Sequence, residues 1–157
     1  MSIDPALQRQ IMGRFATGVT VVTMKAGETL WGMTANAVTS LSLDPPLVLV
    51  CVDKGTQTHG YLNEAGGFAM NILADDQEEI SNRFATPGPK EFSDLDFSEG
   101  QSGAPLLAGT LGYVDCRLKE VLPGGDHDIF VGEIVDGQEG EGRPLLFFGG
   151  RYAALAE

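Results

Sequence analysis

Residues 32–53 read GMTANAVTSLSLDPPLVLVCVD, and this stretch decides the fold. Residues 38–43 (VTSLSL) alternate apolar and polar side chains, which is the pattern of a strand with one buried face. Asp44-Pro45-Pro46 ends that strand, because proline cannot donate a hydrogen bond to a ladder. Residues 47–52 (LVLVCV) form an apolar run short enough for a strand buried on both faces. The sequence therefore predicts two consecutive strands separated by a proline turn.

The first half of the same stretch is polar. Small hydroxyl and amide side chains gather there, and they cannot all face a dry core unpaired, since each unsatisfied group costs about 1–3 kcal/mol. Two interpretations stay open: the side chains satisfy local turns, or a polar planar ligand satisfies some of them. The residues concerned are Thr34, Asn36, Thr39, Ser40 and Ser42.

Short strands and tight turns dominate the remaining chain. The β-branched run at residues 18–24, a turn at 25–28 and a return strand at 29–34 predict a hairpin. Gly is frequent, with 21 of 157 residues, which favours many turns over a helical bundle. Further strands are predicted at residues 68–73, 111–121, 129–135 and 145–148.

Three short helices and one irregular segment complete the expected elements. Asp4 before Pro5 has the pattern of an N-cap and first helical residue. Asp75 is predicted as the N-cap of the third helix. Residues 86–103 are rich in Pro, Gly, Ser and acids, and are long enough for a mobile or functional loop. The predicted helices cover residues 5–12, 58–64 and 75–84.

These elements predict a mainly β (α+β) fold of about six to seven antiparallel strands with short flanking helices. A small barrel is the natural arrangement, because closure removes exposed sheet edges. A Rossmann sheet is disfavoured, since GxGxxG is absent and strands do not alternate with long helices. No repeat or interdomain linker is evident, so residues 1–157 are expected to form a single domain.

Charge and cysteine usage restrict the possible partners and compartment. The net charge of −12 argues against nucleic acid and against an anionic membrane surface. No apolar run approaches the ~18 residues of a membrane span, and the N-terminal MSIDPALQRQ lacks the regions of a signal peptide. Cys51 and Cys116 have no CxxC or metal-type spacing and are expected to be reduced core thiols. A cytoplasmic protein is expected.

Three further polar stretches are candidate sites. Lys54, Thr56 and Thr58 precede a predicted helix, where free backbone N–H groups favour a phosphate, although many loops have this composition. His127 lies between two acids at a turn, and is either a solvated turn histidine or a partner for a substrate. Residues 151–152 (Arg-Tyr) follow two glycines and either place a cation and a ring at a cleft or belong to an ordinary terminal strand.

Protein side chains alone offer no complete catalytic machinery in this sequence. The GxSxG elbow, a Ser/His/Asp order, a glycosidase-type carboxylate pair and metal-ligand spacing are all absent. If the protein is an enzyme, a cofactor is therefore expected to carry the reaction.

Taken together, five motifs in this order resemble the small flavin reductases of two-component flavin-dependent monooxygenases. The resemblance extends over about residues 8–152, and it implies a split β-barrel that binds FMN or FAD. The motifs are RFATGVTVVT (14–23), WGMTANAVTSLSLDPPLVLVCVD (31–53), FAMNIL (68–73), GDHDIFVGEI (125–134) and LLFFGGRY (145–152).

The resemblance also implies a role for each polar stretch. One group would hold the isoalloxazine edge and ribityl chain, a second would lie beside the ring, and a third would hold the flavin phosphate. Further residues would approach the flavin, and a last group would lie on the nicotinamide side with His127 as the catalytic residue. In that order these are Thr34, Ala35, Asn36, Ala37 and Ser40; Cys51, Val52 and Asp53; Lys54, Thr56, Gln57 and Thr58; Arg83, Phe84 and Lys90; and His127, Arg151 and Tyr152.

The implied activity is hydride transfer from NADH or NADPH to flavin N5, with the reduced flavin passed to a separate monooxygenase. A homodimer with flavin at the subunit interface is expected from the same resemblance. Two alternatives stay open. One is a split-barrel flavoprotein that retains its flavin and reduces another acceptor, and the other is a flavin carrier without a nicotinamide site.

Overall fold

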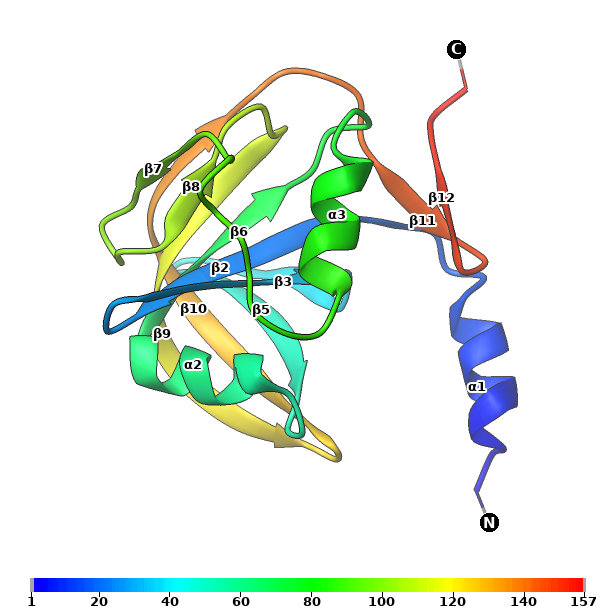
Figure 1. Ribbon diagram of the computed structural model, residues 1–157. Helices are drawn as coiled ribbons and strands as arrows, with labels where there is room; N and C mark the ends of the chain where they lie inside the picture. Colours follow the sequence, from blue (N-terminus) through cyan, green and yellow to red (C-terminus); the bar gives the residue numbers. More distant parts are fainter. Residues whose placement is uncertain (1, 157) are drawn as a thin grey trace.

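The computed structural model describes residues 2–156, and its centre is one seven-stranded antiparallel sheet (Figure 1). The strand order is β3-β2-β6-β9-β10-β5-β4, so three of the six neighbouring pairs are also consecutive along the chain. The predicted number of strands in the barrel sheet is confirmed. The strands are β2 (Thr20–Ala26), β3 (Thr29–Ala35), β4 (Val38–Leu43), β5 (Pro46–Asp53), β6 (Gly67–Ile72), β9 (Gly112–Gly124) and β10 (His127–Glu139).

The proline turn joins β4 and β5 as predicted. Val38 pairs with Val50 and Leu43 with Pro46, and the register shifts between Ser40 and Ser42. Burial on both faces of β5 was wrong, because only alternate residues, including Val50, are fully buried. The intervening side chains, including that of Cys51, are half-buried, because their face is not covered by another layer of the described chain.

The sheet curls so that its two edge strands approach each other. β3 ends at Ala35 and β4 begins at Val38, so two residues connect opposite edges of the sheet. Consecutive Cα atoms are about 3.8 Å apart, which keeps the two strand ends within about 11 Å. No ladder joins β3 to β4 in the described part of the chain. The barrel is therefore split along this seam, and β3 offers a free backbone edge.

Two apolar clusters lie on opposite faces of β2. Val22 and Met24 face the barrel interior with Phe68 and Phe130. Val21 faces the other way, into a cluster that contains Phe84, Phe92 and Leu107 beneath α3. Burial on both faces explains the continuous β-branched run of this strand.

Helices α2 (Gln57–Ala65) and α3 (Glu78–Ala85) both pack beside β3 and β2. The prediction that Asp75 caps the third helix was wrong, because that helix begins only at Glu78, after Gln77. The Asp75 amide instead donates to the carbonyl of Arg143 at 2.7 Å, next to a β-bridge between Ala74 and Pro144. This long-range pairing delays the helix start.

Two small sheets were not predicted. The expected irregular segment contains β7 (Phe97–Glu99), which forms a hairpin with β8 (Pro105–Leu107). A buried amide fixes this hairpin, because the side chain of Asn71 accepts from the Leu107 amide at 2.9 Å. A second sheet, of order β1-β11-β12, joins Thr17–Gly18, Leu146–Phe148 and Arg151–Ala153.

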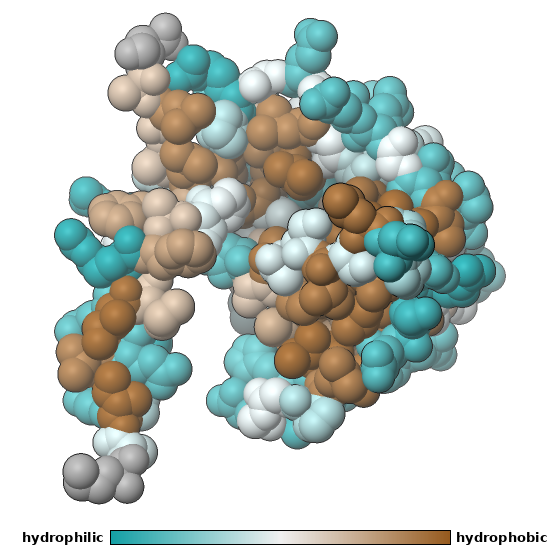
Figure 2. All heavy atoms as spheres, turned by 180° about the vertical axis from the view of Figure 1, so that it is seen from behind, coloured by the Kyte–Doolittle hydropathy of each residue, from teal (hydrophilic) through white to brown (hydrophobic). Residues whose placement is uncertain are grey.

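Helix α1 (Pro5–Met12) projects from the barrel beside β11 and β12 (Figure 1). Its predicted cap is confirmed, since Asp4 Oδ1 accepts from the Ala6 amide at 3.1 Å. None of its residues is buried, and its apolar side chains form a stripe that is visible in Figure 2. In residues 2–156 no helix has the length and apolar character needed to cross a membrane.

Candidate functional site

The main candidate site is a hollow of about 420 Å³ along the free edge of β3, which we call the α2 hollow. Residues 31–33 of β3 form one side, and residues 55–58 at the start of α2 form the second. Residues 84–88 and Lys90 close the third side. Its wall combines an apolar strand surface with a polar end at the N-terminus of a helix.

The N-terminus of α2 leaves backbone donors free at this polar end. Thr56 is the N-cap residue, but its side chain makes no capping bond to the helix. Its hydroxyl donates instead to the carbonyl of Asp53 at 2.8 Å. The Asp53 carboxylate accepts from the Gly55 amide at 2.7 Å, which shapes the loop. Free N–H groups and the helix dipole favour an anion at this position.

Lys90 supplies the positive charge of the α2 hollow. Its Nζ lies 5.1 Å from the centroid of the Trp31 ring and donates to the Thr86 carbonyl. Partial burial lowers the pKa of Lys90 below its ordinary value. The Trp31 ring is held in turn, because its Nε1 donates to the buried Thr58 hydroxyl at 2.9 Å.

A smaller hollow of about 160 Å³ adjoins the first, which we call the tail hollow. It continues along β3 at residues 34–36 and shares Ala85 with the α2 hollow. The Thr34 hydroxyl donates to the Ser81 carbonyl at 2.6 Å, and Ser81 Oγ lies 2.6 Å from the hydroxyl of Tyr152. The contact between Ser81 and Tyr152 connects α3 to β12. The hydroxyl hydrogen of Thr34 is already used in a bond within the protein, so Thr34 cannot donate it to a ligand.

His127 begins β10 beside the loop that forms one wall of the α2 hollow. It pairs with Asp53 across the β10–β5 ladder, and the Lys54 amide donates to the Asp126 carbonyl at 3.0 Å. His127 Nδ1 lies 2.7 Å from Asp126 Oδ1, and this bond lowers the pKa of Asp126. Asp53 and His127 are 74 positions apart in the sequence, and the antiparallel ladder brings them together.

Asp128 links the same turn to α2. Its Oδ2 lies 2.7 Å from His59 Nε2, and its Oδ1 lies 3.9 Å from Lys54 Nζ. Lys54 therefore faces Asp128 and does not line the α2 hollow, which leaves Lys90 as the lysine of that hollow. The pair between His59 and Asp128 had no signal in the sequence, because it depends on the register of β10.

The predicted site residues fall into four groups. Five line the α2 hollow, four line the tail hollow, three lie where the β5–β10 ladder ends at His127, and six lie outside these places. In that order they are Thr56, Gln57, Thr58, Phe84 and Lys90; Thr34, Ala35, Asn36 and Tyr152; Asp53, Lys54 and His127; and Ala37, Ser40, Cys51, Val52, Arg83 and Arg151.

Physical reasons keep several residues out of the hollows. The side chain of Val52 is fully buried in the barrel core, so only its backbone is available to a ligand. Arg83 is engaged by Asp94 at 2.6 and 2.9 Å. Arg151 is exposed on β12 of the small sheet, whereas His127 begins β10 of the barrel sheet.

Sequence reasoning missed the contribution of Trp31, Gly32 and Met33 to the α2 hollow. Gly32 carried a usable signal, since glycine inside a strand often marks a close approach. A Cβ atom at this position would lie 2.8 Å from Cδ1 of Phe84. The missing side chain lets α3 pack against β3 beside the hollow.

Comparisons with known proteins agree with this geometry. Residues 12–156 match the family described as flavin reductase like domain. The reductase component of 4-nitrophenol 4-monooxygenase/4-nitrocatechol 2-monooxygenase from Rhodococcus opacus is 43% identical over 150 residues, which cover 96% of this chain and 80% of that protein. An NADH-dependent FMN reductase of Agrobacterium fabrum is 42% identical over 148 residues, covering 94% and 84%.

A solved structure gives the same relationship in three dimensions. The NADH:FAD oxidoreductase of Streptomyces globisporus C-1027, in complex with NAD and FAD fragments, superimposes with a TM-score of 0.92. The two sequences are 40% identical, and the match covers 99% of this chain and 97% of the other. The fold, the five motifs and these matches agree, and the chain belongs to the flavin reductase like domain family.

Proposed function

We propose that this protein is an NAD(P)H:flavin oxidoreductase, which transfers a hydride from NADH or NADPH to FMN or FAD. The observation that carries the proposal is the α2 hollow, where an apolar strand edge, a free helix N-terminus and Lys90 meet. An isoalloxazine ring needs an apolar surface with a few polar groups, and a phosphate needs donors and positive charge. Both requirements are met within one cavity.

The flavin phosphate is assigned to the α2 end of this hollow. Thr56, Gln57 and Thr58 lie there together with the first N–H groups of α2. Lys90 is the cation beside them, whereas Lys54 faces Asp128 and contributes charge at the rim. A protein with a net charge of −12 thus concentrates a positive potential where the anion binds.

The ring is assigned to the β3 seam, where an edge strand has backbone groups that no further strand of the described chain pairs. These groups can bond the polar edge of the ring. In this proposal Phe84 packs at the ring, and the seam and β5 carry the remaining flavin contacts. The residues assigned to the ring and ribityl chain are Thr34, Ala35, Asn36, Ala37, Ser40, Cys51, Val52 and Asp53.

A bound flavin supplies the two-electron acceptor of the reaction. The protein holds nicotinamide C4 close to flavin N5 and excludes water, which requires no acid or base in line. His127 is the proposed catalytic residue that orients the nicotinamide, because it pairs with Asp53 next to the loop that forms one wall of the α2 hollow. The Asp126 carboxylate contacts Nδ1 of the His127 ring and fixes the orientation of the ring. Nε2 is therefore the ring nitrogen available to the substrate.

The protein is further proposed to act as a homodimer. The apolar side chains of Leu7 and Ile11 are 46% and 52% exposed on α1, and Leu43 on β4 is 92% exposed. Figure 2 shows apolar surface on α1 and on the barrel with open space between them. A second copy would cover both surfaces. It would also give Arg151 and Tyr152 a route to the nicotinamide side of the partner's site.

The reduced flavin is proposed to leave and to serve a separate flavin-dependent monooxygenase in the cytoplasm. Residues 1–157 would act as one domain that exchanges its flavin with solvent. A relative named as a reductase component of a two-component monooxygenase supports this role. The organic substrate belongs to the partner oxygenase.

The test is a steady-state assay that follows the nicotinamide absorbance with NADH or NADPH. FMN, FAD, riboflavin or no flavin is added to the purified protein. Oxidation that saturates with free flavin is the expected result, and it also identifies both cofactor preferences. Oxidation without added flavin would indicate a retained flavin and another acceptor. Flavin binding without oxidation in any combination would contradict the reductase and leave a flavin carrier.

A further inference from the structure

Arg83 makes a two-pronged contact with Asp94. Arg83 Nη1 lies 2.6 Å from Asp94 Oδ1, and Nη2 lies 2.9 Å from Oδ2. Nη1 also donates to the carbonyl of Glu91 at 3.1 Å. The bond to Asp94 raises the pKa of Arg83 and lowers the pKa of Asp94. We call this group of contacts the Arg83 clasp.

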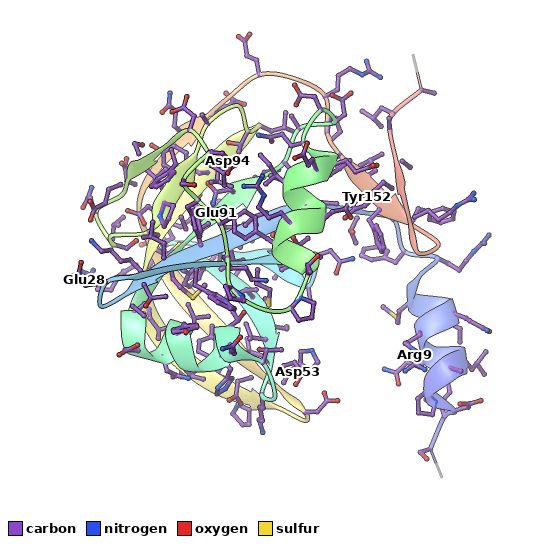
Figure 3. The ribbon with its side chains drawn as sticks, in the orientation of Figure 1. Arg9, Glu28, Asp53, Glu91, Asp94 and Tyr152 are labelled. Atoms are coloured by element: carbon purple, nitrogen blue, oxygen red, sulfur yellow. The ribbon has the colours of Figure 1, made fainter. Side chains whose placement is uncertain are left out.

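The clasp joins α3 to the segment that carries Lys90. Figure 3 shows Asp94 and Glu91 beside α3, on the chain that leads from α3 toward β7. In the same segment, the buried ring of Phe92 packs 5.1 Å from Phe84. The part of the segment before Phe92 forms the third side of the α2 hollow. Residues 91–94 therefore make two contacts with α3, the Arg83 clasp and the packing of Phe92 on Phe84. These contacts hold in place the preceding residues, which form the third side of the hollow.

This wall has little regular structure of its own. Residues 87–96 belong to no helix or strand, and Gly88 has a φ of +104°, which favours glycine. Pro87 and Pro89 lack backbone N–H donors. Besides the bond of its own Nζ to the Thr86 carbonyl, the position of Lys90 over Trp31 thus depends on the side-chain contacts that follow it in the segment.

We infer that Arg83 is a positioning residue that fixes Lys90 in the α2 hollow and does not itself bind the flavin. The inference rests on the proposed function, in which Lys90 contacts the flavin phosphate. Arg83 is absent from the lining of the hollow, although its neighbour Phe84 is part of it. Its guanidinium is directed to Asp94 and Glu91 and would have to leave both to reach a ligand.

Asp94→Asn separates this role from direct binding, because the two roles predict opposite results. If Arg83 binds phosphate directly, removing Asp94 frees the guanidinium and removes a negative charge, so FMN affinity stays equal or rises. If Arg83 acts through Lys90, loosening the clasp weakens FMN binding. We expect the Kd for FMN to rise about three-fold or more in Asp94→Asn and in Arg83→Gln.

Two further measurements connect the effect to the phosphate. Riboflavin lacks the phosphate, so its Kd should change less than two-fold in both variants. In a Lys90→Gln background, Asp94→Asn should add no further loss. Glu79→Gln is the matched control, since Glu79 lies 3.8 Å from Arg83 on α3 itself and does not hold the segment. Thermal unfolding of each variant identifies any that fail to fold.

The outcomes distinguish the inference from the proposed function. Equal or tighter FMN binding by folded Asp94→Asn overturns the clasp, and so does an equal loss for riboflavin. Arg83→Lys keeps the charge but not the two-pronged geometry, so wild-type FMN affinity in that variant also counts against the clasp. If Lys90→Gln retains wild-type FMN affinity, the phosphate assignment fails, and the inference fails with it. Loss in Lys90→Gln without loss in Asp94→Asn removes the inference alone.

Discussion

Lys90 Nζ lies 5.1 Å from the centroid of the Trp31 ring, directly on the wall of the α2 hollow. A cation over an aromatic face is stabilised by about 0.5–1 kcal/mol at an exposed site. The ring cannot drift away, because the Thr58 hydroxyl holds its Nε1 at 2.9 Å. The aromatic side chain therefore presents the ammonium group to an anion at the start of α2.

This contact gives a direct optical test of flavin binding. Trp31 is the single tryptophan of the sequence, so its fluorescence reports the α2 hollow alone. We expect FMN to quench this emission in a saturable titration. Lys90→Gln should shift the titration midpoint to FMN concentrations at least about ten-fold higher, because a charge-assisted contact to phosphate contributes about 1.5–3 kcal/mol. Unchanged emission across the FMN titration, at concentrations that saturate turnover, would place the flavin elsewhere.

Gly32 should not tolerate a side chain. In Gly32→Ala the new Cβ would lie 2.8 Å from Cδ1 of the buried Phe84 ring, so α3 must shift away from β3. Overpacking of this kind costs about 1–3 kcal/mol of folding free energy, and the shift deforms the α2 hollow. Urea unfolding and an FMN titration should show both losses. Gly60→Ala is the control, since nothing lies within 4 Å of its Cβ and alanine favours a helix interior.

His127→Ala should reduce hydride transfer more than flavin binding. His127 pairs with Asp53 next to the loop of the α2 hollow but is not part of its lining, so the flavin loses little contact. Misplacement of the nicotinamide should lower the single-turnover rate about ten-fold or more. Stopped-flow measurement at saturating NADH and FMN separates this rate from affinity. A wild-type rate would remove His127 from the site.

How far the sequence predicts this site depends on how local each feature is. The β4–β5 pair follows from the alternating run and the proline turn, and the polar loop before α2 follows from Thr56 preceding a helix. Lys90 and Phe84 could be assigned only through the resemblance to flavin reductases. No local sequence pattern predicts that Lys90 contacts Trp31. The contact forms only because α3 packs against β3 and brings the segment after α3 next to Trp31.

Features that rest on long-range pairing escaped prediction. The Leu107 amide of β8 depends on the side chain of Asn71, 36 residues away. Likewise α3 begins after Asp75, because the Asp75 amide donates its hydrogen bond to the Arg143 carbonyl. The hydroxyl of Tyr152 lies 2.6 Å from Ser81 Oγ, and these two residues are 71 positions apart in the sequence. A single sequence contains no record of such partners.

The exposed face of α1 should control the oligomeric state. Ile11 is 52% exposed and makes no contribution to the core of the chain, so Ile11→Glu should leave the fold intact. A buried charge at a dimer interface is strongly unfavourable, so this variant should elute as a monomer in light-scattering chromatography. Gln10→Glu adds the same charge to an already polar side chain and should remain dimeric. Equal masses for the two variants and the wild type would exclude α1 from the interface.

The thiol of Cys116 should make stability fall at alkaline pH. Burial, with a smaller contribution from Asp115, raises the pKa of this thiol from its ordinary 9.0 to about 12. In the unfolded chain the thiol loses its proton near pH 9, whereas the folded protein keeps the proton until about pH 12. The unfolded state therefore binds fewer protons in this window, so the free energy of unfolding declines as pH rises from about 9 to about 12. Urea unfolding of the wild type and Cys116→Ala between about pH 8 and 10.5 measures this slope. Cys116→Ala should be less stable than the wild type at about pH 8, because the substitution leaves a cavity. Its free energy of unfolding should decline less steeply with pH. Equal slopes for the two proteins would contradict the role of the Cys116 thiol.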